Sequence, residues 1–280
     1  ARVLPQVLPG RPVPDLAAAY ELDRQTAEAD ALIAVGSGTI NDLCKYTAAR
    51  AGKPYAVFAT APSMNGYTST NASITVRGLK RTLPARVPAG VFMDLRVLAA
   101  APPRLIRAGF GDSICRSTAQ ADWLLAHLLR GDAYRELPFR LLAEEEERLL
   151  AAAEGLLRED LEAMASLART LVLSGLGMTL CGGSHPASQG EHLISHWMEL
   201  QLPPGLDEPL HGEQIAVTTL TMARLQQRLL RSESLRLRPC RLTEAQFHRR
   251  YGAELGPECW REFLPKRLDR RSAERMNDRL

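Results

Sequence analysis

The chain has 280 residues, enough for one large domain or two smaller ones with a substantial core. Apolar residues make up 45% and charged residues 24%, which excludes an intrinsically disordered chain. The net charge is +3, but basic and acidic residues are interleaved and no series of base-stacking aromatic residues accompanies them. We therefore expect no nucleic-acid partner. No uncharged apolar stretch approaches the ~18 residues of a membrane-spanning helix, so no membrane span is expected.

Cysteine usage and the N-terminal residues bear on the compartment. The five cysteines are scattered without close pairs, which argues against a disulfide framework and a zinc knuckle and suits a reducing cytoplasm. The N-terminal ARVLPQVLPG lacks a charged end followed by an apolar run, so no signal peptide is expected. We predict a cytoplasmic protein, and a homodimer or higher homo-oligomer as the general expectation for such chains.

The first hundred residues alternate between strand and helix patterns. Three apolar runs predict buried strands: 31–35, 55–59 and 90–95. A glycine-rich turn and a helical stretch over 39–51 follow the first run, and residues 73–83 predict a hairpin around Arg77-Gly78-Leu79. This order is typical of a parallel sheet built from βαβ units.

The pattern changes near residue 97, where leucine, alanine, glutamate and arginine become dominant. Apolar residues at three- and four-residue spacing predict amphipathic helices over 113–129, 138–155, 159–175 and 211–230. The sequence therefore predicts an α/β domain with a parallel sheet over residues 1–100 and an all-α domain over residues 101–280. A ligand site is expected between the two domains.

Histidine is the least evenly distributed residue type. Four of the six histidines fall within 27 residues: 185, 192, 196 and 211. On a helix that begins near Ser188, His192 and His196 share one face, and His211 begins the next helical stretch. Converging neutral imidazoles would suit a divalent metal ion. Partly buried packing or capping histidines are the alternative, and both interpretations stay open.

A carboxylate would complete such a metal site and leave a position open for water or substrate. Asp112, in Ala108-Gly109-Phe110-Gly111-Asp112, is the best candidate. On residue type and position alone, an N-cap of the following helix is the favoured alternative.

Two loops follow predicted strands and could meet a ligand. Gly36-Ser37-Gly38-Thr39 would let a diphosphate approach the backbone and the start of a helix, although a plain tight turn explains it equally well. The loop over residues 60–69 is dense in hydroxyls and lies where ligands bind in open α/β sheets, with an ordinary polar loop as the alternative. Lys80 and Arg81 could meet a substrate phosphate, but a solvated hairpin tip is favoured for them.

Taken together, the motifs resemble the glycerol-1-phosphate dehydrogenases, within the superfamily of iron-containing alcohol dehydrogenases, glycerol dehydrogenase and dehydroquinate synthase. The resemblance runs from about residue 28 to about residue 220. The matching motifs occur in the family's order: Gly36-Ser37-Gly38-Thr39-Ile40-Asn41-Asp42 with Lys45, Thr60-Ala61-Pro62-Ser63, the block 65–69, Ala108 to Asp112, Glu191-His192, Ser195-His196 and His211-Gly212-Glu213-Gln214.

The resemblance implies a dehydroquinate synthase-like fold, with an α/β N-terminal nucleotide-binding domain over residues 1–100 and a helical metal- and substrate-binding domain over residues 101–280. It also implies a metal-dependent NAD(P)-linked alcohol dehydrogenase, an oxidoreductase of phospholipid metabolism. It would interconvert dihydroxyacetone phosphate and sn-glycerol 1-phosphate, or a closely related polyol or polyol phosphate. A divalent metal, with zinc expected and iron or nickel as alternatives, would bind Asp112, His192 and His211. His196, Asn65 and Asp112 would contact the substrate, and Asp112 and His196 would be the catalytic residues. The implied cofactor contacts are Gly36, Ser37, Gly38, Thr39, Ile40, Thr60, Ala61, Pro62, Ser63 and Ser69.

Three departures from the family pattern affect this interpretation. Asn65 stands where the family has an aspartate, and an amide can neither carry a negative charge nor act as a base. The interval after His196 carries the insertion-like QLPPGLDEP. Most of the family's first strand–helix unit, which helps to distinguish NAD from NADP, is expected to be missing. The alternatives are a sugar-phosphate cyclase of the dehydroquinate synthase type and a catalytically inactive nucleotide-binding member.

Overall fold

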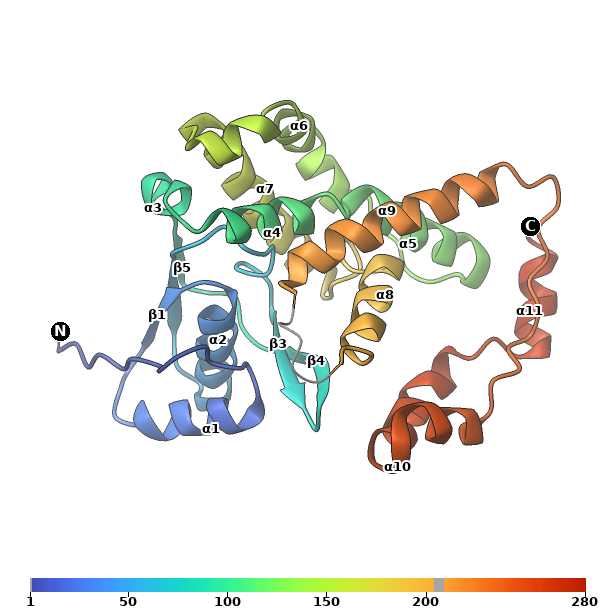
Figure 1. The fold of residues 1–280 in the computed structure, drawn as a ribbon, viewed down its shortest axis with the longest axis horizontal. Coiled ribbons are helices and arrows are strands. Elements are labelled where there is room, and N and C mark those ends of the chain that lie inside the picture. Colours follow the sequence, from blue (N-terminus) through green and yellow to red (C-terminus); the bar gives the residue numbers. More distant parts are fainter. Residues whose placement is uncertain (1, 204–208) are drawn as a thin grey trace. The chain divides into compact units, whose positions relative to one another are not determined.

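A computed structural model describes residues 2–203 and 209–280 (Figure 1). Its contacts divide the chain into two compact units. One comprises Ala1–Trp123 with Tyr134–Arg224, and the other comprises Leu124–Ala133 with Leu225–Leu280. This division differs from the predicted domains of residues 1–100 and 101–280, which stay a prediction.

A three-stranded parallel sheet in the first unit has the order β1 (Leu32–Gly36), β2 (Tyr55–Ala59), β5 (Gly90–Phe92). Helix α2 (Gly38–Ala51) connects β1 to β2, and Gly52 ends it in the left-handed conformation. Val57 of β2 is completely buried, as expected for a central strand covered on its faces. The predicted strands and the βαβ order are confirmed, with the third strand shorter than expected.

The predicted hairpin is also present. β3 (Asn71–Val76) and β4 (Leu79–Pro84) pair antiparallel, and Arg77 adopts a positive φ of 51° in the turn. Helix α1 (Leu16–Gln25) precedes the sheet, and its first turn is capped because the Asp15 carboxylate accepts a hydrogen bond from the amide of Ala18 at 2.8 Å.

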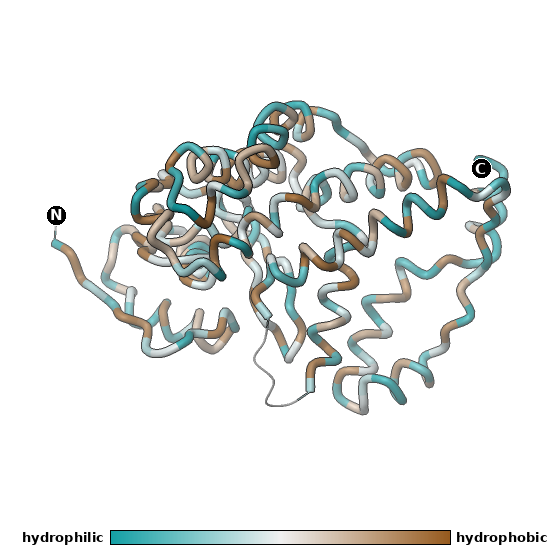
Figure 2. The backbone as a smooth tube through the Cα atoms, turned by 45° about the horizontal axis from the view of Figure 1, so that its top comes forward, coloured by the Kyte–Doolittle hydropathy of each residue, from teal (hydrophilic) through white to brown (hydrophobic). Residues whose placement is uncertain are grey.

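Helices dominate the chain after β5. Their bounds are α3 (Leu95–Ala99), α4 (Pro103–Ser113), α5 (Arg116–Arg130), α6 (Leu137–Ala151), α7 (Leu161–Cys181), α8 (Gly190–Glu199), α9 (His211–Leu230), α10 (Glu244–Phe263) and α11 (Arg270–Asn277), with short 3₁₀ helices at Ala153–Arg158 and Leu264–Lys266. The four predicted amphipathic helices are confirmed as α5, α6, α7 and α9. Hydrophobic and hydrophilic segments alternate along the helical backbone, as amphipathic helices require (Figure 2).

Helix α7 is the central helix of the first unit. Its residues Met164, Leu167 and Leu171 are completely buried in the same hydrophobic core as the parallel strands. By length and composition α7 could cross a membrane, and 61% of its most apolar window is buried inside the protein. Every 18-residue window of α7 includes the charged Arg169, so the helix is not the uncharged apolar stretch that the sequence analysis excludes. The helix instead has the burial of a core helix, since its apolar surface already contacts protein.

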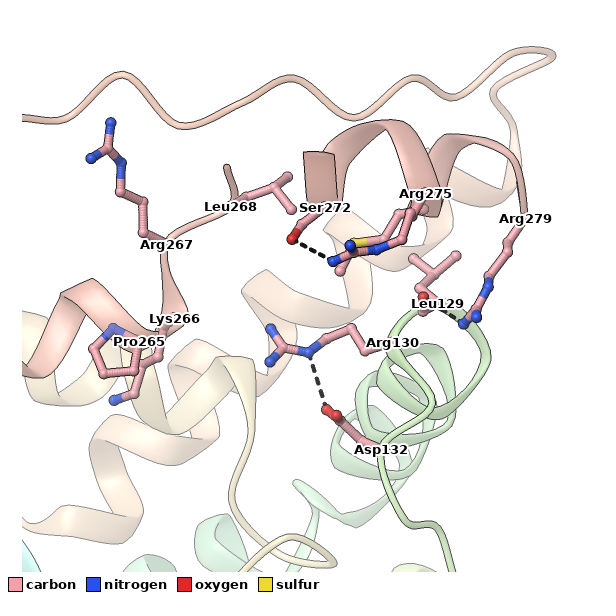
Figure 3. A pocket seen from close by; sticks show the side chains of 11 residues that line it. Leu129, Arg130, Asp132, Pro265, Lys266, Arg267, Leu268, Ser272, Arg275 and Arg279 are labelled. Atoms are coloured by element: carbon pink, nitrogen blue, oxygen red, sulfur yellow. Dashed lines mark hydrogen bonds and ion pairs between the residues drawn. The ribbon is translucent and has the colours of Figure 1, made fainter. Parts of the chain in front are cut away.

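The second unit contains α10 and α11 and a polar pocket of about 200 Å³ (Figure 3). Five cationic side chains line this pocket: Arg130, Lys266, Arg267, Arg275 and Arg279. Asp132 contributes an acidic group to the lining. We call this the arginine pocket.

Candidate functional site

One carboxylate and two imidazoles converge in the first unit. Asp112 lies in the last turn of α4, His192 in the first turn of α8, and His211 is the first residue of α9. One ligand atom from each of these three residues lies within 4.8 Å of the others. We call these residues the donor cluster. Asp112 is inside a helix, so the N-cap interpretation of this residue is wrong.

Two atoms of the donor cluster are buried without a hydrogen-bond partner, namely Oδ1 of Asp112 and Nδ1 of His211. Nε2 of His211 lies 3.6 Å from that carboxylate oxygen, beyond ordinary hydrogen-bond range. Leaving a buried polar atom unpaired costs about 1–3 kcal/mol, so such atoms call for an explanation. The oxygen and nitrogen donors suit a divalent metal ion, and the observed geometry fits one.

Neighbouring groups make hydrogen bonds to two residues of the donor cluster. The completely buried Glu191 carboxylate lies 2.8 Å from Nδ1 of His192, and the backbone amide of Asn65 donates to Oδ2 of Asp112 at 2.8 Å. A carboxylate on one imidazole nitrogen directs the other nitrogen towards a metal and increases its basicity. Sequence reasoning gave Glu191 no role of its own; the acid directly before a candidate ligand was the only signal.

Burial shifts the protonation of the donors. Burial, followed by the charges of His192 and Lys80, holds the pKa of His211 well below its usual range, so its imidazole is neutral near pH 7. Burial raises the pKa of Asp112 to about 6, against the opposing effects of His192 and the Asn65 amide. Cys115 also lies near Glu191 and His192, but burial raises its thiol pKa well above the usual value. A thiol that resists ionisation is a poor metal ligand.

Close helix packing brings Asp112 and His211 together. A Cβ atom on Gly111 would lie 2.3 Å from the carbonyl oxygen of Gly212, and a Cβ on Gly212 would lie 1.8 Å from the carbonyl oxygen of Ala108. Helices α4 and α9 therefore approach through bare glycine backbone. Since Asp112 follows Gly111 and His211 precedes Gly212, this contact sets the spacing of two of the three donors.

The glycine-rich loop lies where β1 ends and α2 begins. Ser37 is the N-cap residue of α2, but its side chain makes no capping hydrogen bond. The first amide groups of the helix are thus available to an anion. A Cβ on Gly36 would lie 2.7 Å from the side chain of Ile40, and one on Gly38 would lie 2.9 Å from Met64. The Gly36 contact lies within the turn itself, whereas the Gly38 contact is with a side chain of the loop that follows β2.

The residues expected to contact the cofactor after β2 form a packed loop. Thr60 continues from the strand, and its amide donates to the Gly36 carbonyl at 3.1 Å, which places the two loops next to each other. Ala61 and Pro62 are buried, and Ser63 is partly buried. Ser69 is 3% exposed, and its hydroxyl is within hydrogen-bond distance of the Gly66 and Asn71 carbonyls. Ser69 therefore fixes the loop itself.

A buried lysine anchors the same loop. The Lys45 ammonium is completely buried and donates to the Gly66 carbonyl at 2.5 Å and the Asn71 carbonyl at 3.2 Å. Burial lowers the pKa of Lys45 to about 8, although the nearby Asp42 carboxylate opposes this shift. Asp42 in turn accepts the backbone amide of Ser73 at 3.0 Å. The motif around Asn41 and Asp42 therefore ties α2 to the loop and to β3.

His196 lies beside the donor cluster, with its ring 6.4 Å from that of His192. Its Nδ1 is 3.2 Å from Oε2 of Glu199, and Oε1 of the same carboxylate lies 3.0 Å from the Lys80 ammonium. The insertion-like segment after His196 falls mainly on residues 204–208, which lie outside the described residues. Asn65 is 9% exposed and meets Asp112 through its backbone.

Comparison with known proteins confirms the resemblance over part of the chain. A family model described as "Iron-containing alcohol dehydrogenase" matches residues 3–102, which include the sheet and both loops. A glycerol-1-phosphate dehydrogenase [NAD(P)+] from Pyrococcus furiosus is 40% identical over 194 residues, covering 69% of this chain and 55% of the relative. One from Halalkalibacterium halodurans is 35% identical over 199 residues, or 71% of this chain and 50% of the relative.

The chain spans about half the length of the curated relatives it matches. Among solved structures, a probable glycerol dehydrogenase from Sinorhizobium meliloti has a TM-score of 0.64 at 23% identity, covering 77% of this chain and 62% of that one. Glycerol dehydrogenase from Schizosaccharomyces pombe has a TM-score of 0.62 at 24% identity, covering 79% and 57%. These structures confirm the predicted fold class of this iron-containing alcohol dehydrogenase relative.

Proposed function

We propose that this protein is a metal-dependent, NAD(P)-linked dehydrogenase that interconverts dihydroxyacetone phosphate and sn-glycerol 1-phosphate. The observation that carries the proposal is the donor cluster, in which two buried polar atoms lack a hydrogen-bond partner. The names of the relatives that are 35–40% identical to this chain support the substrate and the nicotinamide cofactor. A homodimer or higher homo-oligomer in the cytoplasm is part of the same proposal, and the five free cysteines agree with a reducing compartment.

Asp112, His192 and His211 would hold one divalent metal ion, with zinc as the proposed ion and iron or nickel as alternatives. Three protein ligands with an open position are typical of catalytic zinc sites. When bound, the metal would supply a Lewis acid that polarises the substrate carbonyl. Glu191 would hold His192 at Nδ1, and the amide of Asn65 would hold Asp112 at Oδ2, so both donors are oriented before any ligand arrives.

The departure at residue 65 leaves part of the site intact. The hydrogen bond to Asp112 comes from the backbone amide of Asn65, so an aspartate and an asparagine would serve equally well for this contact. The Asn65 side chain could still bind a substrate hydroxyl by donating or accepting. The loss is confined to the negative charge that an aspartate would bring to the substrate.

His196 would transfer the proton to and from the substrate hydroxyl. Glu199 is ionised near pH 7 and accepts a hydrogen bond at Nδ1 of His196, so that nitrogen carries the ring proton in the neutral imidazole. Nε2 is then the nitrogen available to hydrogen-bond the substrate. The cofactor diphosphate would lie at the start of α2, against Gly36, Ser37, Gly38, Thr39 and Ile40, with Thr60, Ala61, Pro62 and Ser63 nearby and Ser69 holding the loop.

The direct test is to follow NADH and NADPH oxidation by absorbance with metal-loaded protein and dihydroxyacetone phosphate, with unphosphorylated dihydroxyacetone in parallel. Turnover on the phosphate in preference to the unphosphorylated ketone is the expected result. Consumption of a sugar phosphate without net nicotinamide oxidation would favour the cyclase alternative, because a cyclase returns its hydride. No turnover on either ketone by protein with a full metal content would overturn the proposal and favour an inactive member.

A further inference from the structure

Beside the donor cluster, three elements meet at the carboxylate of Glu199, the last residue of α8. Its Oε1 lies 3.0 Å from the Lys80 ammonium on β4 and 3.4 Å from Nε2 of Gln214 on α9. Its Oε2 lies 3.2 Å from Nδ1 of His196. The Glu199 side chain is 11% exposed, whereas the Lys80 side chain keeps 26% of its surface exposed. The lysine is thus held in place by Glu199 and still reachable from solvent.

The Glu199 carboxylate is ionised near neutral pH. Burial raises its pKa, but the hydrogen bond from His196 and the charge of Lys80 outweigh that effect and bring it to about 2. Glu199 thus joins Lys80 to His196, whose ring lies 6.4 Å from that of His192 in the donor cluster. These contacts place the positive charge of Lys80 on the His196 side of the donor cluster, where the reacting end of a substrate would lie.

The other lysines near the sheet donate hydrogen bonds to backbone carbonyl groups. Lys45 is completely buried and hydrogen-bonded to loop carbonyls. Lys53 donates to the carbonyls of Thr26 and Ala27 at 2.7 and 2.9 Å. Lys80 differs because its partner is a carboxylate, and a doubly charged phosphate can compete with a carboxylate for an ammonium group. The hairpin that carries Lys80 also ends in an exposed turn at Arg77.

We propose that Lys80 binds the phosphate group of the substrate and makes the site selective for a phosphorylated ketone or polyol. The proposal rests on the dehydrogenase function above and deepens it by naming a specificity-determining residue. In the absence of phosphate, the Glu199 carboxylate pairs with the Lys80 ammonium and keeps it near His196. When the substrate binds, its phosphate pairs with the ammonium beside Glu199 or in its place. The remaining hydroxyl and carbonyl groups of the substrate then lie towards His196 and the donor cluster.

The test compares Lys80→Met and Lys80→Arg with wild-type protein, all metal-loaded. Calorimetry measures the dissociation constants of sn-glycerol 1-phosphate and of glycerol, so the readout does not depend on turnover. A charge-assisted hydrogen bond contributes about 1.5–3 kcal/mol, so Lys80→Met should weaken phosphate binding by about 10- to 100-fold. Lys80→Arg should retain most of the wild-type affinity for sn-glycerol 1-phosphate. Selectivity for sn-glycerol 1-phosphate over glycerol should fall in the order wild type, Lys80→Arg, Lys80→Met.

Arg77→Gln is the matched control, because it removes one positive charge from the exposed turn of the same hairpin. This variant should bind sn-glycerol 1-phosphate as wild type does, and metal content should be equal in all variants. Equal phosphate affinity in wild type and Lys80→Met would overturn the role of Lys80. Lysine-dependent phosphate binding without any ketone reduction would instead leave this inference standing and overturn the proposed dehydrogenase function.

Discussion

The donor cluster and the arginine pocket are both rich in charged or ionisable side chains, yet they differ in how those groups are satisfied. In the donor cluster, Asp112 is 1% exposed and one of its oxygens has no hydrogen-bond partner. In the arginine pocket, Arg130 pairs with Asp132 at 3.2 Å, Arg275 donates to Ser272, and Arg279 donates to the Leu129 carbonyl. Figure 3 shows these guanidinium groups next to those partners.

This contrast shows which of the two polar regions is expected to bind a ligand. Unpaired atoms in a buried site cost free energy, so a protein that retains them points to a missing ligand. Arginines at an exposed pocket keep their hydration, and exposed ion pairs contribute only about 0–1 kcal/mol. The pocket of about 200 Å³ in the second unit therefore indicates less about function than the donor cluster, which has three ligand atoms within 4.8 Å.

The most severe test of this contrast is His211→Ala. Loss of one of three protein ligands should weaken metal affinity by at least about 100-fold, more than the typical loss when a residue that hydrogen-bonds a ligand is removed. We expect plasma emission spectrometry of the dialysed variant to show a metal content near zero, with turnover lost at the same time. His248→Ala in α10 is the matched control and should retain its metal, because His248 pairs with the exposed Glu244. Full metal retention in His211→Ala would contradict the ligand assignment.

Gly212→Ala tests whether the close crossing of α4 and α9 builds the donor cluster. The added Cβ would lie 1.8 Å from the carbonyl oxygen of Ala108, so the helices must separate. We expect a loss of about 3 kcal/mol in unfolding free energy, measured by chemical denaturation, together with weaker metal binding. Gly183→Ala is the control, because its Cβ would meet only His185, at an ordinary 3.4 Å. Unchanged stability of Gly212→Ala would mean that the crossing is looser than described.

Lys45 offers a pH test of the anchored loop, since its pKa of about 8 lies below the usual value for lysine. Between this pKa and about 10.4, the unfolded chain holds the proton that the folded chain has lost, so stability rises with pH. We expect the unfolding free energy to increase by about 2 kcal/mol from pH 8 to pH 10, relative to Lys45→Met. Parallel pH profiles for the two proteins would show that Lys45 keeps an ordinary pKa.

The smallest effect is expected in the arginine pocket. Arg275→Ala removes a side chain that donates a hydrogen bond to the Ser272 hydroxyl at 3.0 Å. Stability should change by less than about 0.5 kcal/mol, as for most surface substitutions, and metal content should stay the same. Thermal unfolding and metal analysis check both. A loss of metal or of several kcal/mol here would remove the contrast between the two regions.

Local patterns in the sequence determined much of the fold. The apolar runs at β1 and β2, the glycine-rich turn between β1 and α2, and the three- and four-residue spacing in α5, α6, α7 and α9 each reflect interactions between near neighbours in the chain. The sequence predicts a third strand over 90–95, but β5 ends at Phe92, because periodicity gives poor information on where a strand ends. Composition alone likewise does not separate α7 from a membrane span, since a core helix and a membrane span share the same composition.

Tertiary structure decided the candidate site. The histidine spacing leaves packing and metal binding as equal alternatives, and the residue type and position of Asp112 alone favour an N-cap over a metal ligand. Only the crossing of α4 and α9 at Gly111 and Gly212 shows that Asp112 and His211 face each other. Likewise, the pairing of Lys80 with Glu199 joins residues 119 positions apart. Sequence patterns report contacts between neighbours along the chain, whereas convergence of donors from separate helices depends on how those helices pack.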